Sequence, residues 1–451
     1  MIQKLPQLSA PPGYRTQATP FAPETWPFSL DMLPDQTYVV GGSIRDQLLE
    51  RQSNYLDLDL VLLDQAVEIA STIAKKYDAG FVVLDKERQI ARVVFDQVTV
   101  DFAQQQGDRI EDDLQRRDFT VNAIAFHPTS RTLIDPLKGQ ADLDAKIIRM
   151  ISYQNLADDP LRLMRAYRQA AQLGFTLERD TQAAISQLAP QLQQISVERI
   201  RHELDALLST SKGSIQLDSI WRNRLLAFCL PQFDGTSVQQ IVAVDDAILF
   251  LQTTWPTYAH SLRDWIKPVP SGCYRSWEKV TKLSCLLTPN AAAATQELAQ
   301  LKYSRTEAQI VLRLVKARSA IKQLREGPMD RDQQFFLFKA AGSAFPAIAL
   351  LALSKGVEMQ VLKPMIERFL DPADALAHAQ PLLNGTLLMQ QLEIAPGPEI
   401  GPLLAAVEQA QAEGKIKTQV EAIAWIKDHR ASHTASRLDN HIAERCGRTS
   451  I

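Results

Sequence analysis

Two aspartates separated by one residue, Asp57 and Asp59, lie in the apolar run LDLDLVLL. Because side chains alternate between the faces of a strand, both carboxylates are expected on one face, with the intervening leucines toward the core. Adjacent acids repel each other unless a cation lies between them, and Mg²⁺ typically binds through one or two carboxylates together with substrate phosphates. The pattern predicts a magnesium site at these two residues. The alternative is a strand edge with two solvated carboxylates.

A third carboxylate, Asp101, lies in another apolar β-type run, VTVDFA. Two strands that carry three carboxylates can hold the pair of metal ions used in in-line phosphoryl transfer. Asp101 is therefore predicted to be catalytic and metal-binding together with Asp57 and Asp59. Considered alone, it could equally be a partly buried, hydrogen-bonded acid.

The segment GGSIRD, residues 41–46, stands between an expected strand and an expected helix. Glycines let a backbone approach a phosphate closely, a helix N-terminus favours an anion, and Arg45 can add a charged hydrogen bond. The segment is neither a Walker A sequence nor a dinucleotide-binding fingerprint. It is predicted to bind phosphate only in combination with the carboxylates.

The elements that must position these residues form a mixed α/β head from Thr37 to about residue 151. Short β-type runs alternate there with two helical ones, residues 44–50 and 66–77, and helical periodicity dominates after Ser152. The strand candidates are TYVV, DLDLVLL, FVVL, RVVF, VTVDFA and NAIAF. The fold class is α+β, and the expected parts are an irregular Pro-rich leader (1–34), a catalytic head (35–150), a helical neck (151–205), a helical body (206–375) and a helical tail (376–451).

Several helix boundaries are readable from capping residues. Asp159 followed by Pro160 is expected to start a helix that stops at Gly174, and another helix is expected to begin at Ser196. Further helices are expected over residues 221–230, 296–324, 334–353 and 403–410.

Six segments in order resemble the motif set of class II tRNA nucleotidyltransferases and bacterial poly(A) polymerases. They are GGSIRD, LDLDLV, RRDFTVNAIAF, DPLKGQADLDAKIIR, DDPLRLMRAYRQAAQLGF and SVERIRHEL. The resemblance covers residues 37–205, and LLNGTLLM followed by PGPEIGPLLAAVEQAQAEGKIKT is similar to the family's tail. Residues 206–380 match only as generic helices.

The resemblance implies roles for individual residues. Asp57 and Asp59 would bind Mg²⁺, and Asp101 would help to activate the RNA 3′ hydroxyl. Two departures from the family are Asp158, where Glu is common, and Gln104 to Gln106, where an arginine is frequent. The predicted nucleotide-binding residues are Gly41, Gly42, Arg45, Asp46, Arg116, Arg117, Asp118, Asn122, Asp158, Asp159, Arg162, Arg165 and Arg168. The alternative for Arg117 and Asp118 is a surface ion pair.

Asp159 and Arg162 are predicted to choose the incoming base. They are three residues apart, and therefore on one helix face, with Arg165 and Arg168 continuing the row. An aspartate accepts hydrogen bonds and an arginine donates them, which matches the amino group beside a ring nitrogen in cytosine and adenine. The family's EDxxR motif, which this pair resembles, reads the base in the same way. The alternative is a solvated helix face with ion pairs between neighbouring turns.

A basic stretch is the expected RNA contact. Between Ala299 and Gly327 there are seven Lys or Arg residues and only two Glu. A basic helix face of this kind can follow a phosphate backbone without reading sequence. The alternative is a solvated amphipathic helix. The residues predicted to bind RNA are Lys302, Arg305, Arg313, Lys316 and Lys322.

The predicted function is addition of C and/or A to tRNA 3′ ends from CTP and ATP. Complete CCA addition is slightly favoured, but a short segment from Leu84 to Arg92, where relatives carry a loop that influences the switch from C to A, keeps CC-only or A-only addition open. A poly(A) polymerase acting on other RNA, an inactive RNA-binding protein and a small-molecule nucleotidyltransferase are the rivals. Intact carboxylates oppose the second rival, and the long helical arm opposes the third.

Composition agrees with a soluble enzyme. The chain has 451 residues, 45% of them hydrophobic and 22% charged, which is ordinary for a globular protein. Its net charge of −3 does not by itself indicate a nucleic-acid partner, so any RNA contact must come from locally basic surface. Four scattered cysteines without a CxxC pair favour the reducing cytoplasm, and we expect neither signal peptide nor membrane span.

Overall fold

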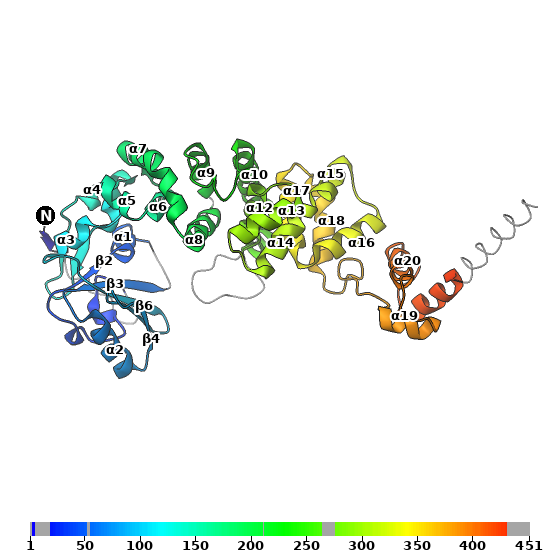
Figure 1. Cartoon of the computed structure of the whole chain (residues 1–451), viewed down its shortest axis with the longest axis horizontal. Coiled ribbons are helices and arrows are strands. Elements are labelled where there is room, and N and C mark those ends of the chain that lie inside the picture. Colours follow the sequence, from blue (N-terminus) through cyan, green and yellow to red (C-terminus); the bar gives the residue numbers. More distant parts are fainter. Residues whose placement is uncertain (1, 5–18, 52–54, 211, 264–275, 431–451) are drawn as a thin grey trace, which may run out of the picture. The chain divides into compact units, whose positions relative to one another are not determined.

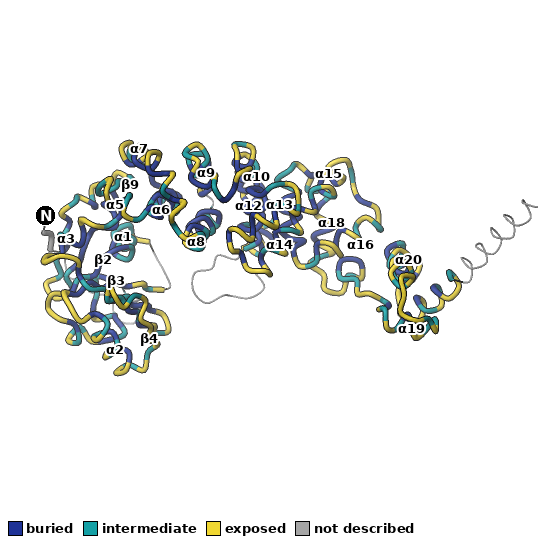
Figure 2. The backbone as a smooth tube through the Cα atoms, in the orientation of Figure 1, coloured by how far each residue is buried: buried dark blue, intermediate teal, exposed yellow. Residues whose placement is uncertain are grey.

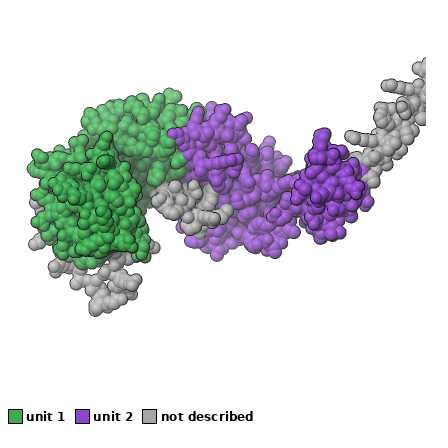
Figure 3. Space-filling model, turned by 60° about the horizontal axis from the view of Figure 1, so that its bottom comes forward, with its two compact units in different colours: residues 1–231 green, residues 232–451 purple. Residues whose placement is uncertain are grey.

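The structure, a computed structural model, describes residues 2–4, 19–51, 55–210, 212–263 and 276–430. It divides into two compact units, Met1–Pro231 and Gln232–Ile451 (Figure 3). The predicted α+β class is confirmed, because all the long strands lie in the N-terminal unit and the second unit is helical (Figure 1). The division falls beyond the expected start of the body at residue 206, because helices after the neck still pack on it.

An eight-stranded sheet forms the head, in the order β1-β8-β7-β2-β3-β6-β5-β4. Only β3 and β6 pair in parallel, and every other neighbouring pair is antiparallel. The strands are β1 (Ile2–Lys4), β2 (Thr37–Val40), β3 (Leu56–Leu62), β4 (Gly80–Asp85), β5 (Ile90–Val94), β6 (Val98–Gln104), β7 (Ala125–His127) and β8 (Thr132–Ile134). The expected strand NAIAF is wrong in its first half, where Thr120–Asn122 forms a 3₁₀ turn, η3.

One face of the sheet is covered by α2 (Ala66–Tyr77), which packs on β4, β5 and β6. The leader helps to cover it: the Phe28 ring lies 6.3 Å from that of Phe102, and Trp26 is buried. The leader is therefore not merely an irregular extension where it is described. Its residues 2–4 add a strand beside β8, and its aromatic side chains complete the core.

The opposite face is covered only at one end. There Val40, Val61, Ile110, Leu114 and Ala123 belong to a buried cluster formed with α3 (Ile110–Gln115). Farther along this face, toward the β4 edge, Val82 and Val94 are exposed and Arg92 and Asp101 are partly exposed. The tube of β4 is coloured as exposed (Figure 2). The predicted catalytic residues lie on this open part, beside α1 (Gly42–Leu48).

The neck, residues 151–205, is mainly helical and contains one short strand. Helix α6 (Leu161–Leu173) packs on α8 (Val197–Leu208) and α9 (Gly213–Arg222), and it ends at Gly174 in the left-handed conformation, with φ of 72°. The neck also contains α5 (Tyr153–Asp158), β10 (Thr176–Leu177) and α7 (Arg179–Leu188), and the head ends with α4 (Gly139–Ala145) and β9 (Ile147–Ile148). The helix expected over residues 221–230 is wrong, because α9 ends at Arg222 and turns follow.

The second unit contains helices around an apolar core. A single helix over residues 296–324 is wrong: turns at 301–304 and Ala317 divide this region. The helices are α10 (Gly235–Thr254), α11 (Pro256–Ser261), α12 (Trp277–Leu286), α13 (Ala291–Gln300), α14 (Arg305–Lys316), α15 (Arg318–Glu326), α16 (Arg331–Ala341), α17 (Phe345–Ser354), α18 (Met359–Leu370), α19 (Gly385–Leu392) and α20 (Ile400–Ala412), with a further helix over 419–430.

One stretch in this unit, Arg331–Ser354, has the length and apolar composition of a membrane span among the described residues. However, 67% of its apolar window is buried inside the fold, which is the behaviour of core helices in a soluble protein. Residues 383–426 form a smaller apolar cluster of their own, which includes Leu388, Val407 and Ile426. This cluster lies within the segment 376–451 that the sequence predicts as the tail.

Candidate active site

The three predicted catalytic carboxylates lie on neighbouring strands. In the parallel pairing of β3 with β6, Asp59 is opposite Asp101 and Asp57 is opposite Thr99. Residues opposite each other in a ladder point to the same face, so all three carboxylates belong to the open face. Leu58 and Leu60, between and beyond them, are 1% and 0% exposed on the other face. The alternation predicted for this strand is confirmed.

Electrostatics at these carboxylates favour a cation. Burial, followed by the charges of Asp101 and Asp57, raises the pKa of Asp59 to about 6 even though Arg117 opposes the shift. Burial and the charge of Asp101 also raise the pKa of Asp57. Within the described ranges, no group of three or more His, Cys, Asp or Glu side chains has the arrangement of a complete metal site. The donor set nevertheless fits a divalent ion, because its oxygen ligands are the hard ligands that Mg²⁺ prefers and its charges repel one another.

Arg92, on β5, is the cation nearest to this group. It lies opposite Asp101 in the β5–β6 ladder and donates two hydrogen bonds to that carboxylate, 2.6 Å from Nε to Oδ1 and 2.7 Å from Nη2 to Oδ2. A hydrogen bond to Asp101 raises the pKa of the Arg92 guanidinium. Asp101 is thus held in place by a bidentate pair, the geometry that orients carboxylates most firmly.

The turn after β2 brings backbone against the carboxylates. Gly41 has φ of 82°, and a Cβ on it would lie 2.5 Å from Oδ2 of Asp59. Only glycine fits, because a side chain here would meet the carboxylate and strain the backbone. Gly42 is the first residue of α1. The backbone N–H groups at the N-terminus of this helix therefore lie beside Asp59.

Arg45 links this turn to the RRDFTVNA motif. Its Nε and Nη2 donate to the carboxylate of Asp46, each at 3.0 Å, and its Nη1 donates to Oδ1 of Asn122 at 2.8 Å. Nδ2 of Asn122 in turn donates to Oδ1 of Asp118 and to Oε1 of Gln169 on α6. Arg45 and Asn122, 77 residues apart in the chain, therefore join the two motifs by a direct hydrogen bond.

Asp118 lies inside this network, with 6% of its surface exposed. Its Oδ2 accepts a hydrogen bond from Nε of Arg165 at 2.9 Å, and its Oδ1 accepts from the Phe119 N–H. Burial alone would raise the pKa of Asp118, but the Arg165 charge and these hydrogen bonds together lower it. The expected alternative of an Arg117–Asp118 ion pair is not formed, since Arg117 pairs with Asp113 at 2.9 Å.

Asp159 and Arg162 lie at the junction of α5 and α6. The sequence predicts Asp159 as the N-cap of α6. Pro160 takes that position, so Asp159 lies one residue before the cap. Its Oδ2 accepts from Nη2 of Arg199 at 3.0 Å, and Nη1 of Arg162 donates to the main-chain oxygens of Arg116 and Asn155 at 3.0 and 2.9 Å. Nε and Nη2 of Arg162 have no hydrogen-bond partner among the described residues.

The other polar residues of the neck have separate partners. Arg168 pairs with Glu203 on α8, and Asp158 accepts from Nε2 of Gln154 at 2.7 Å. The expected alternative is a helix face with ion pairs between neighbouring turns. Among the described residues, Arg165 and Arg168 instead pair with acids on other segments, Asp118 and Glu203. Arg116 is exposed and contributes its carbonyl oxygen to Arg162.

The residues predicted to bind RNA are exposed in the second unit, but they do not lie on one helix. Lys302 precedes α14, Lys322 lies on α15, and Arg305, Arg313 and Lys316 lie on α14 between them. Arg313 and Lys316 line a hollow of about 700 Å³ that also includes Phe336 and Gln409.

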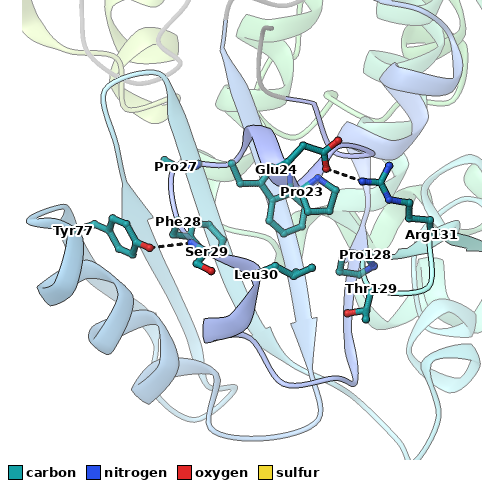
Figure 4. A pocket seen from close by; sticks show the side chains of 11 residues that line it. Pro23, Glu24, Pro27, Phe28, Ser29, Leu30, Tyr77, Pro128, Thr129 and Arg131 are labelled. Atoms are coloured by element: carbon teal, nitrogen blue, oxygen red, sulfur yellow. Dashed lines mark hydrogen bonds and ion pairs between the residues drawn. The ribbon is translucent and has the colours of Figure 1, made fainter. Parts of the chain in front are cut away.

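Another hollow, of about 600 Å³, lies between the leader and the head (Figure 4). Its walls include Trp26, Tyr77 and Pro128, with an ion pair of 2.8 Å between Arg131 and Glu24. The Tyr77 hydroxyl accepts from the Ser29 N–H at 2.9 Å. This hollow contains none of the predicted site residues, since it is built by the leader against the helix-covered side of the sheet.

Comparison with known proteins agrees with these observations. The model named "Poly A polymerase head domain" matches residues 37–149. The model described as "Probable RNA and SrmB- binding site of polymerase A" matches 174–236, and the one described as "tRNA nucleotidyltransferase domain 2 putative" matches 275–426. The CC-adding tRNA nucleotidyltransferase of Synechocystis is 40% identical over 89% of this chain and 95% of its own length. The chain belongs to the tRNA nucleotidyltransferase family.

Relatives of this tRNA nucleotidyltransferase differ in their named products. The A-adding tRNA nucleotidyltransferase of Deinococcus radiodurans is 32% identical over 88% of this chain and 96% of its own length. The Bacillus stearothermophilus CCA-adding enzyme in complex with CTP has a similar fold, with a TM-score of 0.66, 22% identity, and coverage of 89% of this chain and 94% of that one. The expected family is confirmed.

Several residues of this nucleotidyltransferase site were not predicted. Arg92, Asp113, Gln169, Arg199 and Glu203 all bind predicted residues. Arg92 could have been found, because strand alternation in IARVV places it on the polar face. Arg199 and Glu203 lie in the SVERIRHEL motif, whose internal spacing does not show which carboxylate or guanidinium each would reach.

Proposed function

We propose that this tRNA nucleotidyltransferase adds cytidines to the 3′ end of tRNA, forming the CC part of the terminal CCA and releasing pyrophosphate from CTP. The observation that carries the proposal is the alignment of Asp57, Asp59 and Asp101 on one sheet face beside the Gly41–Gly42 turn. Carboxylates that hold metal, next to a helix N-terminus that holds phosphate, are what in-line nucleotidyl transfer needs.

The residues take separate tasks in this proposal. The turn at Gly41 and Gly42, with Arg45, holds the triphosphate, and Asp57 and Asp59 bind Mg²⁺. Mg²⁺ would supply charge neutralisation at the reacting phosphate. Asp101 is oriented by Arg92, and it would lie beside the RNA 3′ hydroxyl and help to take up its proton.

The network around Asp118 holds these parts together. Through Asn122 it fixes Arg45, and through Arg165 it fixes α6, whose first turn carries Arg162. The free Nε and Nη2 donors of Arg162, with the partly exposed carboxylate of Asp159, would read the base edge. Arg117 and Arg116 would contact the nucleotide at the rim, and Arg168 would support the neck through Glu203.

One observation favours CC addition over complete CCA addition, and another favours it over A addition. A turn of only four residues, 86–89, joins β4 to β5 in the segment where relatives carry a loop that influences the switch to A. The similarity to the CC-adding enzyme of Synechocystis is also higher than that to the A-adding enzyme of Deinococcus radiodurans, which favours CC addition over A addition. This revises the expectation that complete CCA addition is slightly favoured.

The exposed cations Lys302, Arg305, Arg313, Lys316 and Lys322 would bind the tRNA backbone, and the tail, residues 376–451, would be a second tRNA contact. The described cysteines, Cys229 and Cys285, are buried and unpaired, in keeping with a protein of the reducing cytoplasm.

Sequencing of reaction products tests the function. A tRNA transcript that lacks all three terminal nucleotides is incubated with CTP and ATP in Mg²⁺, and we expect products that stop at CC. Growth only from a transcript ending in CC would identify an A-adding enzyme, and a complete CCA end would identify a CCA-adding one. Long adenosine tails would indicate a poly(A) polymerase, and the absence of any extension would support an inactive RNA-binding protein.

A further inference from the structure

One cross-strand row runs from the nucleotide side of the sheet to its free edge. In order it contains Val40 on β2, Asp59 on β3, Asp101 on β6, Arg92 on β5 and Val82 on β4, each opposite the next in its ladder. All five side chains therefore point to the same face, which is covered at Val40 and open beyond it. The middle of the row contains the charged residues Asp59, Asp101 and Arg92, and the residue at the free edge, Val82, is apolar.

Exposed apolar side chains surround Arg92 at that edge. Val82 is 46% exposed and Val94 is 43% exposed, and Val94 lies in the neighbouring row, opposite Thr99. The hydroxyl of Tyr55 contacts the Thr99 hydroxyl, so this ring, 45% exposed, borders the same surface. Gly80, opposite Val94, adds no side chain and leaves the surface shallow.

We propose that Tyr55, Val82, Arg92 and Val94 form a binding surface for the terminal nucleoside of the RNA primer, here called the primer shelf. The proposal rests on the proposed function and names the part of the site that takes the second substrate. An RNA end is chosen over a protein segment because the shelf directly continues the catalytic row, beside Asp101.

Position along the row supports this assignment. The triphosphate turn at Gly41 lies on the β2 side of the carboxylates, so the primer must approach from the β5 and β4 side. Strands are about 4.8 Å apart, which places Val82 about 10 Å from Asp101. This is the scale of one nucleoside, so a 3′ hydroxyl at Asp101 leaves its own ribose and base above the shelf.

The chemistry of the shelf also suits a nucleoside. Bases bind proteins through their flat faces on aromatic and apolar side chains, without regard to sequence. Nη1 of Arg92 has no hydrogen-bond partner among the described residues, so it can donate to the primer's last phosphodiester while Nε and Nη2 keep Asp101 oriented. A surface that accepts any base suits an enzyme whose primer end changes after each addition.

The strand β4 offers a matched control. Phe81 and Val83 are 40% and 41% exposed, but they lie opposite Val93 and Ala91, which are buried on the face covered by α2. Val82→Gln with Val94→Gln alters the shelf, whereas Phe81→Gln with Val83→Gln alters the other face of the same hairpin.

Steady-state kinetics and photocrosslinking together test the shelf. The shelf double variant is expected to raise KM for the tRNA primer about tenfold, the scale of one lost base stack, while KM for CTP stays within twofold. The control double variant should change neither constant. In the wild type, a tRNA whose last nucleotide is 4-thiouridine should crosslink within residues 80–94 or at Tyr55.

The outcomes separate the shelf from the function. Crosslinks confined to other parts of the chain, or equal KM for RNA in the shelf and control variants, overturn the shelf while transfer itself continues. Failure of the wild type to extend any tRNA overturns the proposed function, and the shelf with it. Circular dichroism confirms that each variant is folded before it is compared.

Discussion

Arg165 and Asp118, 47 residues apart in the chain, meet through a hydrogen bond of 2.9 Å from Nε to Oδ2. Asp118 is buried in the head, and Arg165 belongs to the long neck helix α6. This contact fixes α6, which carries Arg162, to the RRDFTVNA motif, whose Asn122 binds Arg45. Residues predicted to bind the nucleotide thus act first as the joint between two parts of the site.

Removing the guanidinium should destabilise this joint. We expect Arg165→Met to lower the free energy of unfolding by about 2 kcal/mol, since a buried carboxylate loses a charged hydrogen bond. The side chain of Arg165 is 38% exposed, so the larger cost of a fully buried pair does not apply. Urea denaturation measures the change. Arg179→Met, at an exposed arginine of α7, is the control and should be nearly neutral.

Acid should reduce the contribution of the same carboxylate. The pKa of Asp118 is lower in the folded protein than its ordinary value of 3.8, so its stabilising effect is present above that value and is lost as pH falls through the folded pKa. The difference in unfolding free energy between wild type and Asp118→Asn should therefore be constant near neutrality and narrow below about pH 4. A difference that widens on acidification contradicts the assignment.

Loss of either carboxylate that we propose to bind Mg²⁺ should abolish transfer. We expect Asp57→Ala and Asp59→Ala each to lower kcat by about a thousandfold or more in Mg²⁺, while tRNA affinity measured by filter binding changes little. Asp64→Ala, at an exposed aspartate just after β3, should retain activity. Residual rates within about tenfold of wild type would rule out the metal-site assignment.

Arg162→Ala should damage base selection. Without the guanidinium donors, the ratio of kcat/KM for CTP to that for UTP should fall by roughly a hundredfold, because a lost hydrogen-bond match removes discrimination. Competition between labelled CTP and UTP on one tRNA measures the ratio, with Arg179→Ala as the control. An unchanged preference for CTP means that other residues read the base.

Charge reversal of Arg313, Lys316 and Lys322 to Glu should weaken tRNA binding and flatten its dependence on salt, because fewer counterions are released. The apparent affinity for CTP should stay nearly constant. Reversal of Lys75 and Lys76, which are exposed on α2 in the head, serves as the control. An equal salt slope in the triple variant and wild type would show that these residues form only a solvated surface.

Local patterns in the sequence were sufficient for features that depend on neighbouring residues. Alternation predicted β3 and its two aspartates, helical periodicity predicted α2 with both ends correct, and Gly174 marked the end of α6. The ordered motifs identified the family. In each case the signal lies within one element, where backbone geometry dictates the side-chain spacing.

Only tertiary structure decided which distant residues meet. The in-register pairing of Asp59 with Asp101, the bond from Arg92 to Asp101, and the burial of Asp118 against Arg165 depend on ladders and helix packing between separate segments. The turn at Ala317 likewise divides a basic stretch that reads as one helix. Residue spacing fixes a position on its own element, whereas hydrogen-bond partners across elements follow from strand order, register and packing.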